Sequence, residues 1–344
     1  MHPINKYISF IVFTTFLSVN LASCRKINID GPSHEEQYPM GYVVSEVQAK
    51  ASDKNNITTD NISSEGSAFK VFAYYTTDGK KYEASDDAFD SFNDIVRFDE
   101  GSATNWSSDQ THYWYVGAYY KFRAYYPAEF PATITDSKAS TPSFSGFTIE
   151  PMPQNQTDIL FAEVQKATED TFLQGLTVPF QFKHLLSKVY LKVKMSQELV
   201  NDGFTADILA AGFRDVTRTA GYNKDSWTAH SGKTDVGMNF SSVKELPDED
   251  NLLDLFDNGI LVIPQEVTAG VVRAYIHVEL PIGNSGNKIE RPIEITLPAS
   301  SPAWEPGKIY IYTATITADY NIEFSTPTVA NWEGGSTSGA VVIR

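Results

Sequence analysis

The chain has 344 residues, of which 43 are acidic and 27 basic, so its formal charge at pH 7 is -16. Such an excess of carboxylates argues against binding nucleic acid, whose phosphates require a basic face. The chain contains a single cysteine, which excludes intrachain disulfides and metal sites built from several thiolates. At roughly 150 residues per domain, the length predicts two domains.

Residues 1–23 have the pattern of a secretory signal peptide. Lys6 precedes an apolar stretch over residues 8–17, and small residues follow it up to Cys24. A transmembrane helix would need about 20 predominantly apolar residues, and this stretch is too short and too diluted by threonine and serine. The string LASC resembles the lipobox of signal peptidase II substrates, which implies cleavage of residues 1–23 and acylation of Cys24. Two or more acyl chains give stable anchoring to a membrane.

Residues 24–39 are polar and turn-rich, so we expect a tether between the lipid and the folded part. The remaining sequence consists of short alternating runs of β-branched and aromatic residues bounded by Gly, Pro, Asn and Asp, which predicts an all-β fold. The clearest strand covers residues 188–195, where one face is apolar and the other carries lysines. The apolar face consists of Val189, Leu191, Val193 and Met195, and the polar face of Lys188, Lys192 and Lys194.

A second alternating strand covers residues 272–280. Further strands are expected at 69–75, 119–126, 260–263, 293–297, 309–317 and 341–343, and short helices near 84–92 and 249–256. Many short strands with regularly spaced turns indicate β-sandwiches. The polar segment 165–175 separates two strand-rich halves, so we expect an N-terminal domain over 40–176 and a C-terminal domain over 177–344.

The search for catalytic motifs identifies no catalytic, cofactor-binding or metal-binding residues. The sequence lacks a Gly-x-Ser-x-Gly elbow, a P-loop and a His-Glu-x-x-His motif, and its six histidines are scattered. His34 lies in the expected tether, and we interpret His184 as a hydrogen-bonded structural residue. Two acidic clusters lack the register of a calcium loop, which favours solvated loops. These clusters are Asp86, Asp87, Asp90 and Asp94, and Asp248, Glu249, Asp250 and Asp254.

Aromatic residues are concentrated between positions 106 and 120. Such rings could form a stacking platform for a sugar or a partner protein. Alternating aromatics are also ordinary in paired strands, and this second interpretation, in which they fill a sandwich core, is favoured. The residues are Trp106, Tyr113, Trp114, Tyr115, Tyr119 and Tyr120.

With these features in place, most of the chain after Cys24 resembles a known family, the fimbrillins of Gram-negative anaerobes. These are the type V pilins and their relatives, and the resemblance is strongest to the Mfa-like branch. It rests on the order and spacing of several strings rather than on any one of them. They are the lipobox at Cys24, FKVFAYY (69–75), YYKFRAYYP (119–127), TDILFAE (157–163), VPFQFKHLLSKVYLKVKM (178–195), LVIPQ (261–265), WEPGKIYIYTATI (304–316) and VANW (329–332).

The resemblance implies two tandem antiparallel β-sandwich domains of transthyretin-like topology. It also implies a lipoprotein of the outer membrane, at the cell surface or in a fimbrium, whose partners are other fimbrial subunits and a surface receptor or glycan. In shaft pilins of the family, an arginine-specific protease removes an N-terminal segment, and a strand of a neighbouring subunit replaces it. This chain has Thr58, Thr59 and Asp60 where the family commonly has Thr-Arg. Either Lys50 or Lys54 is then the candidate cleavage site, or this member stays lipidated as an anchor, a tip or accessory adhesin, or an independent surface protein.

The chain closes with a Gly-rich stretch, residues 334–339, and an apolar run, Val341, Val342 and Ile343. This run is either a donor strand for another subunit or an edge strand of the second sandwich. The sequence thus predicts a non-enzymatic, fimbrillin-like lipoprotein that serves as a structural or adhesive fimbrial subunit. The alternatives are a surface glycan-binding lipoprotein and a glycoside hydrolase, whose carboxylate pair only the fold would reveal.

Overall fold

A computed structural model describes residues 37–47, 57, 62–76, 90–135, 142–168, 173–246, 252–267, 270–281, 287–319 and 321–332. Several sequence predictions fall outside these residues. They are the signal peptide 1–23, most of the tether 24–39, the lipidation site Cys24, the candidate cleavage sites Lys50 and Lys54, and the candidate donor strand Val341, Val342 and Ile343.

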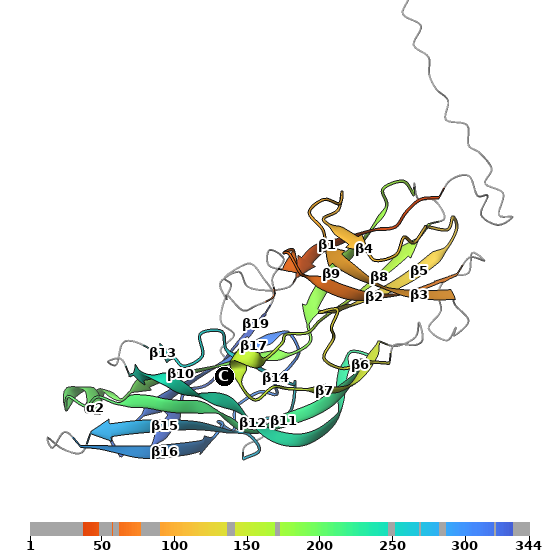
Figure 1. Cartoon of the computed structure of the whole chain (residues 1–344). Coiled ribbons are helices and arrows are strands. Elements are labelled where there is room, and N and C mark those ends of the chain that lie inside the picture. Colours follow the sequence, from red (N-terminus) through yellow and green to blue (C-terminus); the bar gives the residue numbers. More distant parts are fainter. Residues whose placement is uncertain are drawn as a thin grey trace, which may run out of the picture. The chain divides into compact units, whose positions relative to one another are not determined.

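The N-terminal part of the described chain forms one seven-stranded sheet (Figure 1). Its strands, in spatial order, are β1 (Gly41–Val47), β9 (Thr177–His184), β8 (Leu160–Ala167), β5 (Tyr119–Tyr126), β2 (Ala68–Thr76), β3 (Asp90–Phe98) and β4 (Trp106–Ser108). All neighbours are antiparallel except β1 and β9, which are parallel. Tyr42 of β1 and Trp106 of β4 belong to one hydrophobic core, so the sheet curls until its two ends share an interior.

The remaining strands form two six-stranded sheets. One contains β13 (Leu253–Asp254), β10 (Ser187–Met195), β17 (Lys308–Ile316), β18 (Ile322–Phe324), β14 (Ile260–Val262) and β19 (Thr328–Asn331). The other contains β16 (Lys288–Thr296), β15 (Arg273–Pro281), β11 (Asp207–Asn223), β7 (Ser143–Thr148), β6 (Thr133–Ile134) and β12 (Ser226–Glu245). Apolar side chains from both sheets, such as Leu191 and Ile276, fill one core between them. This is a β-sandwich.

The predicted all-β sandwich fold is confirmed, with two differences in detail. Besides β1 and β9, strands β10 and β17 are also parallel, so the sheets are mixed rather than purely antiparallel. The helix expected near 249–256 is wrong in its described part, because Leu253–Asp254 pairs with β10. A short apolar run does not distinguish a strand from a helix by periodicity. Residues 90–92 of the other expected helix belong to β3. The transthyretin-like topology stays a prediction.

The predicted alternation along two strands is confirmed on the apolar side. All four apolar residues of the 188–195 strand are buried, as are those of β15 from Ala274 to Leu280. Lys188 departs from the pattern, since it is only 2% exposed although it was expected to face water. Its ammonium lies 5.0 Å from the ring centroid of Trp332, so a cation–π contact accompanies its burial.

Sheet membership changes twice along the chain. Strands β6 and β7, which precede residue 150, pair with each other, and β7 pairs with β11 of the sandwich. Strand β9, which begins at Thr177, pairs with β8 and β1 in the seven-stranded sheet. The division into 40–176 and 177–344 stays a prediction, and the strand pairing puts residues from either side of position 176 into each of the two regions.

Candidate assembly site at the edge strand β1

Strand β1 forms one edge of the seven-stranded sheet. Burial alternates along this strand, since Tyr42 and Val44 point into the core while Val43 lies on the other face. A shift of register between Val44 and Glu46 adds one residue to β1, and Val47 thereby returns to the buried side. In the described chain β1 has one hydrogen-bonded neighbour, β9, along which it runs in parallel from the pair Gly41 and Thr177 onward.

The inner face of β1 lies against a layer of aromatic rings. The Tyr42 ring stacks on Phe180 of β9, with centroids 6.3 Å apart and planes 9° apart. Phe180 in turn meets Phe69 of β2 edge to face at 5.4 Å, and Phe69 contacts Trp106 of β4 at 4.9 Å. Strand β1 therefore covers an apolar floor contributed by three other strands.

Polar contacts fix the beginning of β1. The Met40 amide donates to the His112 carbonyl at 2.8 Å, and the Trp114 amide donates to the Tyr38 carbonyl at 2.9 Å. Within the strand, Ser45 Oγ donates to the carbonyl of Phe180 at 3.2 Å. The Tyr42 hydroxyl is buried with no hydrogen-bond partner among the described atoms, and this burial, with the nearby Asp94 carboxylate, raises the pKa of Tyr42.

The buried side chains of β1 contribute substantially to the stability of its sheet. Met40, Tyr42, Val44 and Val47 are each less than 9% exposed. At about 1.5–3 kcal/mol per buried apolar side chain, these four contribute at most about 6–12 kcal/mol, which is comparable to the stability of a whole domain. Loss of β1 would also leave the edge of β9 unpaired over an apolar groove. Another strand with the same alternation could restore both contributions.

The predicted site residues lie outside the described ranges, so only their positions in the sequence can be compared with β1. Lys50 and Lys54 follow shortly after β1, within the segment 48–56 that lies outside the described residues. Val341, Val342 and Ile343 lie beyond Trp332, the last residue described. Their roles, and that of Cys24, stay predictions.

The aromatic cluster is divided between core and surface. Trp106, Trp114 and Tyr120 are at most 4% exposed and belong to the core, as the favoured interpretation expected. Tyr113 is 39% exposed, and Tyr115 is half-buried. The rings that the alternative interpretation would assign to a stacking platform therefore do not form one exposed surface.

In each of the two acidic clusters, one described carboxylate has protein partners. Asp94 accepts the amides of Ile95 and Gln110 and lies 3.1 Å from His112 Nε2. Asp254 lies 3.7 Å from Lys192 Nζ. Within the described ranges, no group of three or more His, Cys, Asp or Glu residues is arranged to hold a metal ion.

His184 is a hydrogen-bonded structural residue, as predicted, but the sequence analysis missed its surroundings. Its Nδ1 lies 2.6 Å from Asp158 Oδ2, and both side chains are buried. The imidazole stacks on the indole of Trp332, with centroids 4.0 Å apart and planes 5° apart. Asp158 and Trp332 lie far from His184 in the sequence, on opposite sides of it, so no local pattern could have joined the three residues.

Comparisons with known proteins agree with this fold. A crystal structure of a fimbrial protein from Bacteroides vulgatus is similar to this chain at 17% identity, with a TM-score of 0.65, and covers 86% of this chain and 99% of its own. A protein of Bacteroides uniformis with a proposed role in cell adhesion gives 19% identity, a TM-score of 0.50 and the same coverage. A counterpart from Parabacteroides distasonis gives 8% identity, a TM-score of 0.51 and coverage of 88% and 99%. These likenesses establish the fold.

A comparison with curated proteins gave no match. Within the described part of the chain, no helix has the length and apolar character needed to cross a membrane. The profile of the fimbrillin-like family matches residues 54–332, which is well over half of the sequence. The chain belongs to the fimbrillin-like family.

Proposed function

We propose that this protein is exported as a lipoprotein anchored through Cys24, is released from that anchor by cleavage, and joins its neighbours in a fimbria by strand addition. The observation that carries the proposal is strand β1, a parallel edge strand with a buried face of Met40, Tyr42, Val44 and Val47. Membership in the fimbrillin-like family and the similarity to a Bacteroides fimbrial protein support it. The role is structural or adhesive and requires no catalytic group.

The proposed assembly begins with cleavage after Lys50 or Lys54. Such a cut leaves β1 attached only by non-covalent contacts, which are its hydrogen bonds to β9, the backbone hydrogen bonds at its beginning and side-chain packing. An incoming strand then displaces β1 and pairs with β9 along the same edge. The apolar run Val341, Val342 and Ile343 of another subunit is the candidate strand.

The test compares two proteins by size-exclusion chromatography after β1 is removed. Protein beginning at Ala51 should form oligomers that resist mild denaturant, because the vacant edge of β9 accepts a strand from a second copy. The same protein ended after Gly339 should remain monomeric. Uncut protein with an intact β1 is the control and should remain monomeric. Monomers in both truncated proteins, with equal stability, would exclude assembly through these two segments.

The lipid on Cys24 gives the proposed subunit its place at the outer membrane. Mass spectrometry of the N-terminus of the natural protein tests this part separately. An acylated Cys24 would identify an anchored subunit, and an N-terminus near Ala51 a subunit matured by cleavage. An unprocessed Met1 in the mature protein would contradict both.

A further inference from the structure

One of the two sandwich sheets, the one that contains β11 and β15, has a hollow on its outer face that the proposed assembly does not use. Strands β12, β11, β15 and β16 lie side by side there. Their register puts Asn239, Ala210, His277 and Pro292 in one row across the sheet. In the next row on this side of the sheet, Gly212 is paired with Gly237 of β12 and with Tyr275 of β15.

Small residues lie at the centre of this face, beside and beneath the hollow. Gly212 and Gly237 approach so closely that an added Cβ on Gly212 would lie 2.2 Å from the Val236 carbonyl oxygen. The Tyr275 ring lies across this glycine pair, near both positions. Beside it, Ala210 forms a low floor flanked by larger side chains. The result is an open hollow of about 240 Å³, smaller than pockets for drug-sized ligands, which span about 300–1,000 Å³.

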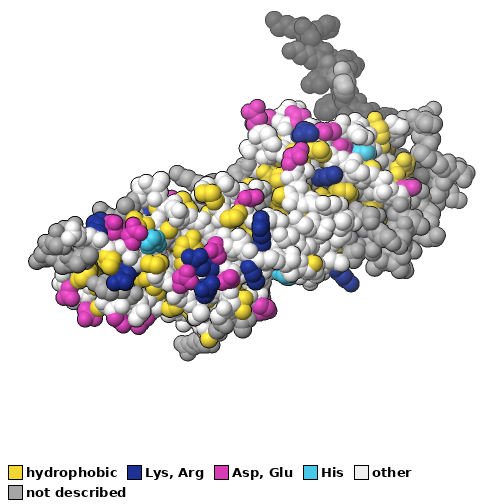
Figure 2. Space-filling model, turned by 60° about the horizontal axis from the view of Figure 1, so that its bottom comes forward, with side chains coloured by type: hydrophobic (Ala, Val, Ile, Leu, Met, Phe, Trp, Pro, Cys, Tyr) yellow, Lys and Arg dark blue, Asp and Glu magenta, His cyan; other side chains and the backbone are white. Residues whose placement is uncertain are grey.

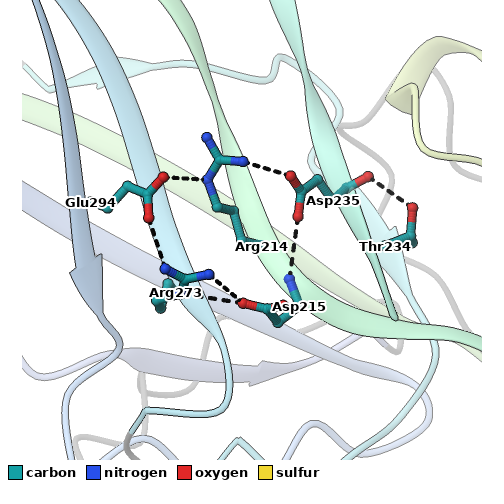
Figure 3. Close-up of polar contacts among 6 residues, drawn as sticks. All are labelled: Arg214, Asp215, Thr234, Asp235, Arg273 and Glu294. Atoms are coloured by element: carbon teal, nitrogen blue, oxygen red, sulfur yellow. Dashed lines mark hydrogen bonds and ion pairs between the residues drawn. The ribbon is translucent and has the colours of Figure 1, made fainter. Parts of the chain in front are cut away.

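A network of ion pairs holds one wall of the hollow in place (Figure 3). The Arg214 guanidinium lies between two carboxylates, 2.6 Å from Asp235 Oδ2 through Nη1 and 2.6 Å from Glu294 Oε1 through Nε. Arg273 Nη1 donates to Glu294 Oε2 at 2.9 Å, and its Nη2 donates to Asp215 at 2.6 Å. Arg214 also lies over the Tyr275 ring, 4.6 Å from its centroid. Glu294 and Arg214 are therefore fixed before any ligand arrives.

The backbone beneath the network has an unusual conformation. Asp215 has a φ of +62°, which is rare for a residue with a side chain. It lies in the bulge of β11 between Phe213 and Val216, where the register of pairing with β12 shifts. Bulges re-aim side chains and are common beside functional sites. Here the bulge directs Arg214 and Asp215 toward Asp235 and Arg273.

The chemistry of the lining excludes several ligand classes. The network joins two arginines to three carboxylates, so it offers no excess positive charge for an anion. The same arginines occupy the carboxylates that a metal cation would need. Figure 2 shows acidic and basic side chains interspersed on the visible face, without a large region of one sign.

The remaining groups of the hollow suit hydroxyl groups. The Asn239 amide and the Tyr275 hydroxyl make no hydrogen bond to other described residues, and each can both donate and accept. The His277 ring lies 3.3 Å from Glu290 and is one-third exposed, so it can also meet a ligand. A ligand with several adjacent hydroxyl groups matches donors and acceptors placed around a small floor.

We propose that this hollow, formed by Ala210, Asn239, Tyr275 and His277 and walled by the Arg214–Glu294 pair, binds one neutral sugar unit of a glycan. The site lies on the sandwich, away from the residues of β1, and its binding does not depend on assembly. It would give the subunit an adhesive surface of its own.

The test uses the mature chain and saturation-transfer NMR with a neutral hexose panel, together with the uronic acid and amino sugar forms of each hexose. Neutral hexoses should bind at millimolar concentration, and Asn239→Ala should weaken their binding about tenfold, because it removes the hydrogen bonds of one amide. Ala210→Leu should abolish binding by filling the floor.

Asn201→Ala is the matched control, since Asn201 is exposed on the short helix α2 (Gln197–Asn201) and lies outside the lining. It should bind like the natural protein. Asn239 is exposed, so its variant should fold, and an unchanged denaturation midpoint verifies this. Absence of hexose binding, equal binding by Asn239→Ala, or tighter binding of uronic acids would each overturn the proposal.

Discussion

The stack of Trp332 on His184 predicts a measurable energetic coupling between the end of β19 and the end of β9. Trp332 is fully buried, and its amide donates to the Gly307 carbonyl at 2.8 Å. His184 is held from the other side by Asp158 at 2.6 Å. Replacing Trp332 with Ala removes a buried indole and should lower the free energy of unfolding by about 3–5 kcal/mol.

The stack itself should appear as a departure from additivity. Ring pairs contribute about 0.5–1.5 kcal/mol beyond the area they bury. The changes Trp332→Ala and His184→Ala should therefore couple by at least about 0.5 kcal/mol in a double-mutant cycle. Trp106→Ala provides the control, because Trp106 is also buried but belongs to the separate core of the seven-stranded sheet. Trp106→Ala should lower the free energy of unfolding by a similar amount, and its effect should be additive with that of His184→Ala.

Urea denaturation followed by circular dichroism measures each variant, with the slope of the transition used to verify that the unfolding mechanism is unchanged. Trp332→Ala should shift the midpoint strongly to lower urea concentration. The double variant should lose less free energy of unfolding than the two single variants lose together. Additivity within about 0.3 kcal/mol, or a cost of Trp332→Ala below about 1 kcal/mol, would refute the argument that this stack joins the two regions.

The remaining predictions concern single residues. Leu191→Ala should lower the free energy of unfolding by about 2–5 kcal/mol, because Leu191 is fully buried. Lys192→Ala should lower it little, because the Lys192 side chain is only half-buried. Equal shifts of the denaturation midpoint in the two variants would contradict the alternation along the strand. Cys24→Ser should leave folding intact and abolish incorporation of a fatty-acid analogue, and undiminished label would exclude lipidation at that residue. Burial raises the pKa of Asp254 above its usual value of 3.8. The folded state therefore binds the carboxyl proton more tightly than the unfolded state does, and the contribution of Asp254 to the free energy of unfolding falls as the pH rises through this pKa. Asp254→Asn should therefore be more favourable relative to the natural protein at pH 7 than at pH 3, and a difference independent of pH would count against this reasoning.

Local sequence patterns predicted most strands because a half-buried strand imprints its two faces on every second residue. Residues 119–126 and 188–195 illustrate this, since the observed strands β5 and β10 match them to within one residue. The burial of Lys188 was not predictable, because its environment depends on Trp332, which lies near the other end of the described chain. Alternation identifies which side chains share a face, but not what covers that face.

The candidate sites show the same limit more strongly. The strand that contains Tyr42 and Val44 was not among those predicted, and its pairing with a strand that begins at Thr177 leaves no local signal in the sequence. The hollow depends on Ala210, which lies beside residues of β12 and β15 in a register flanked by two of the three register shifts between β11 and β12. Such irregularities leave no distinct signal in a single sequence.

The parallel pairing of β1 with β9 also bears on how the chain folds. Gly41 meets Thr177 only after the long stretch of chain between them has been ordered into at least part of the sheet. Contacts of such long sequence separation form late and slow folding, since the entropy of closing the loop precedes the gain from the contact. We expect β1 to be the last strand of its sheet to add during folding after export. For a period the nascent subunit would thus expose the edge of β9, a stage at which binding by a chaperone, or premature capture by another subunit, would decide its fate.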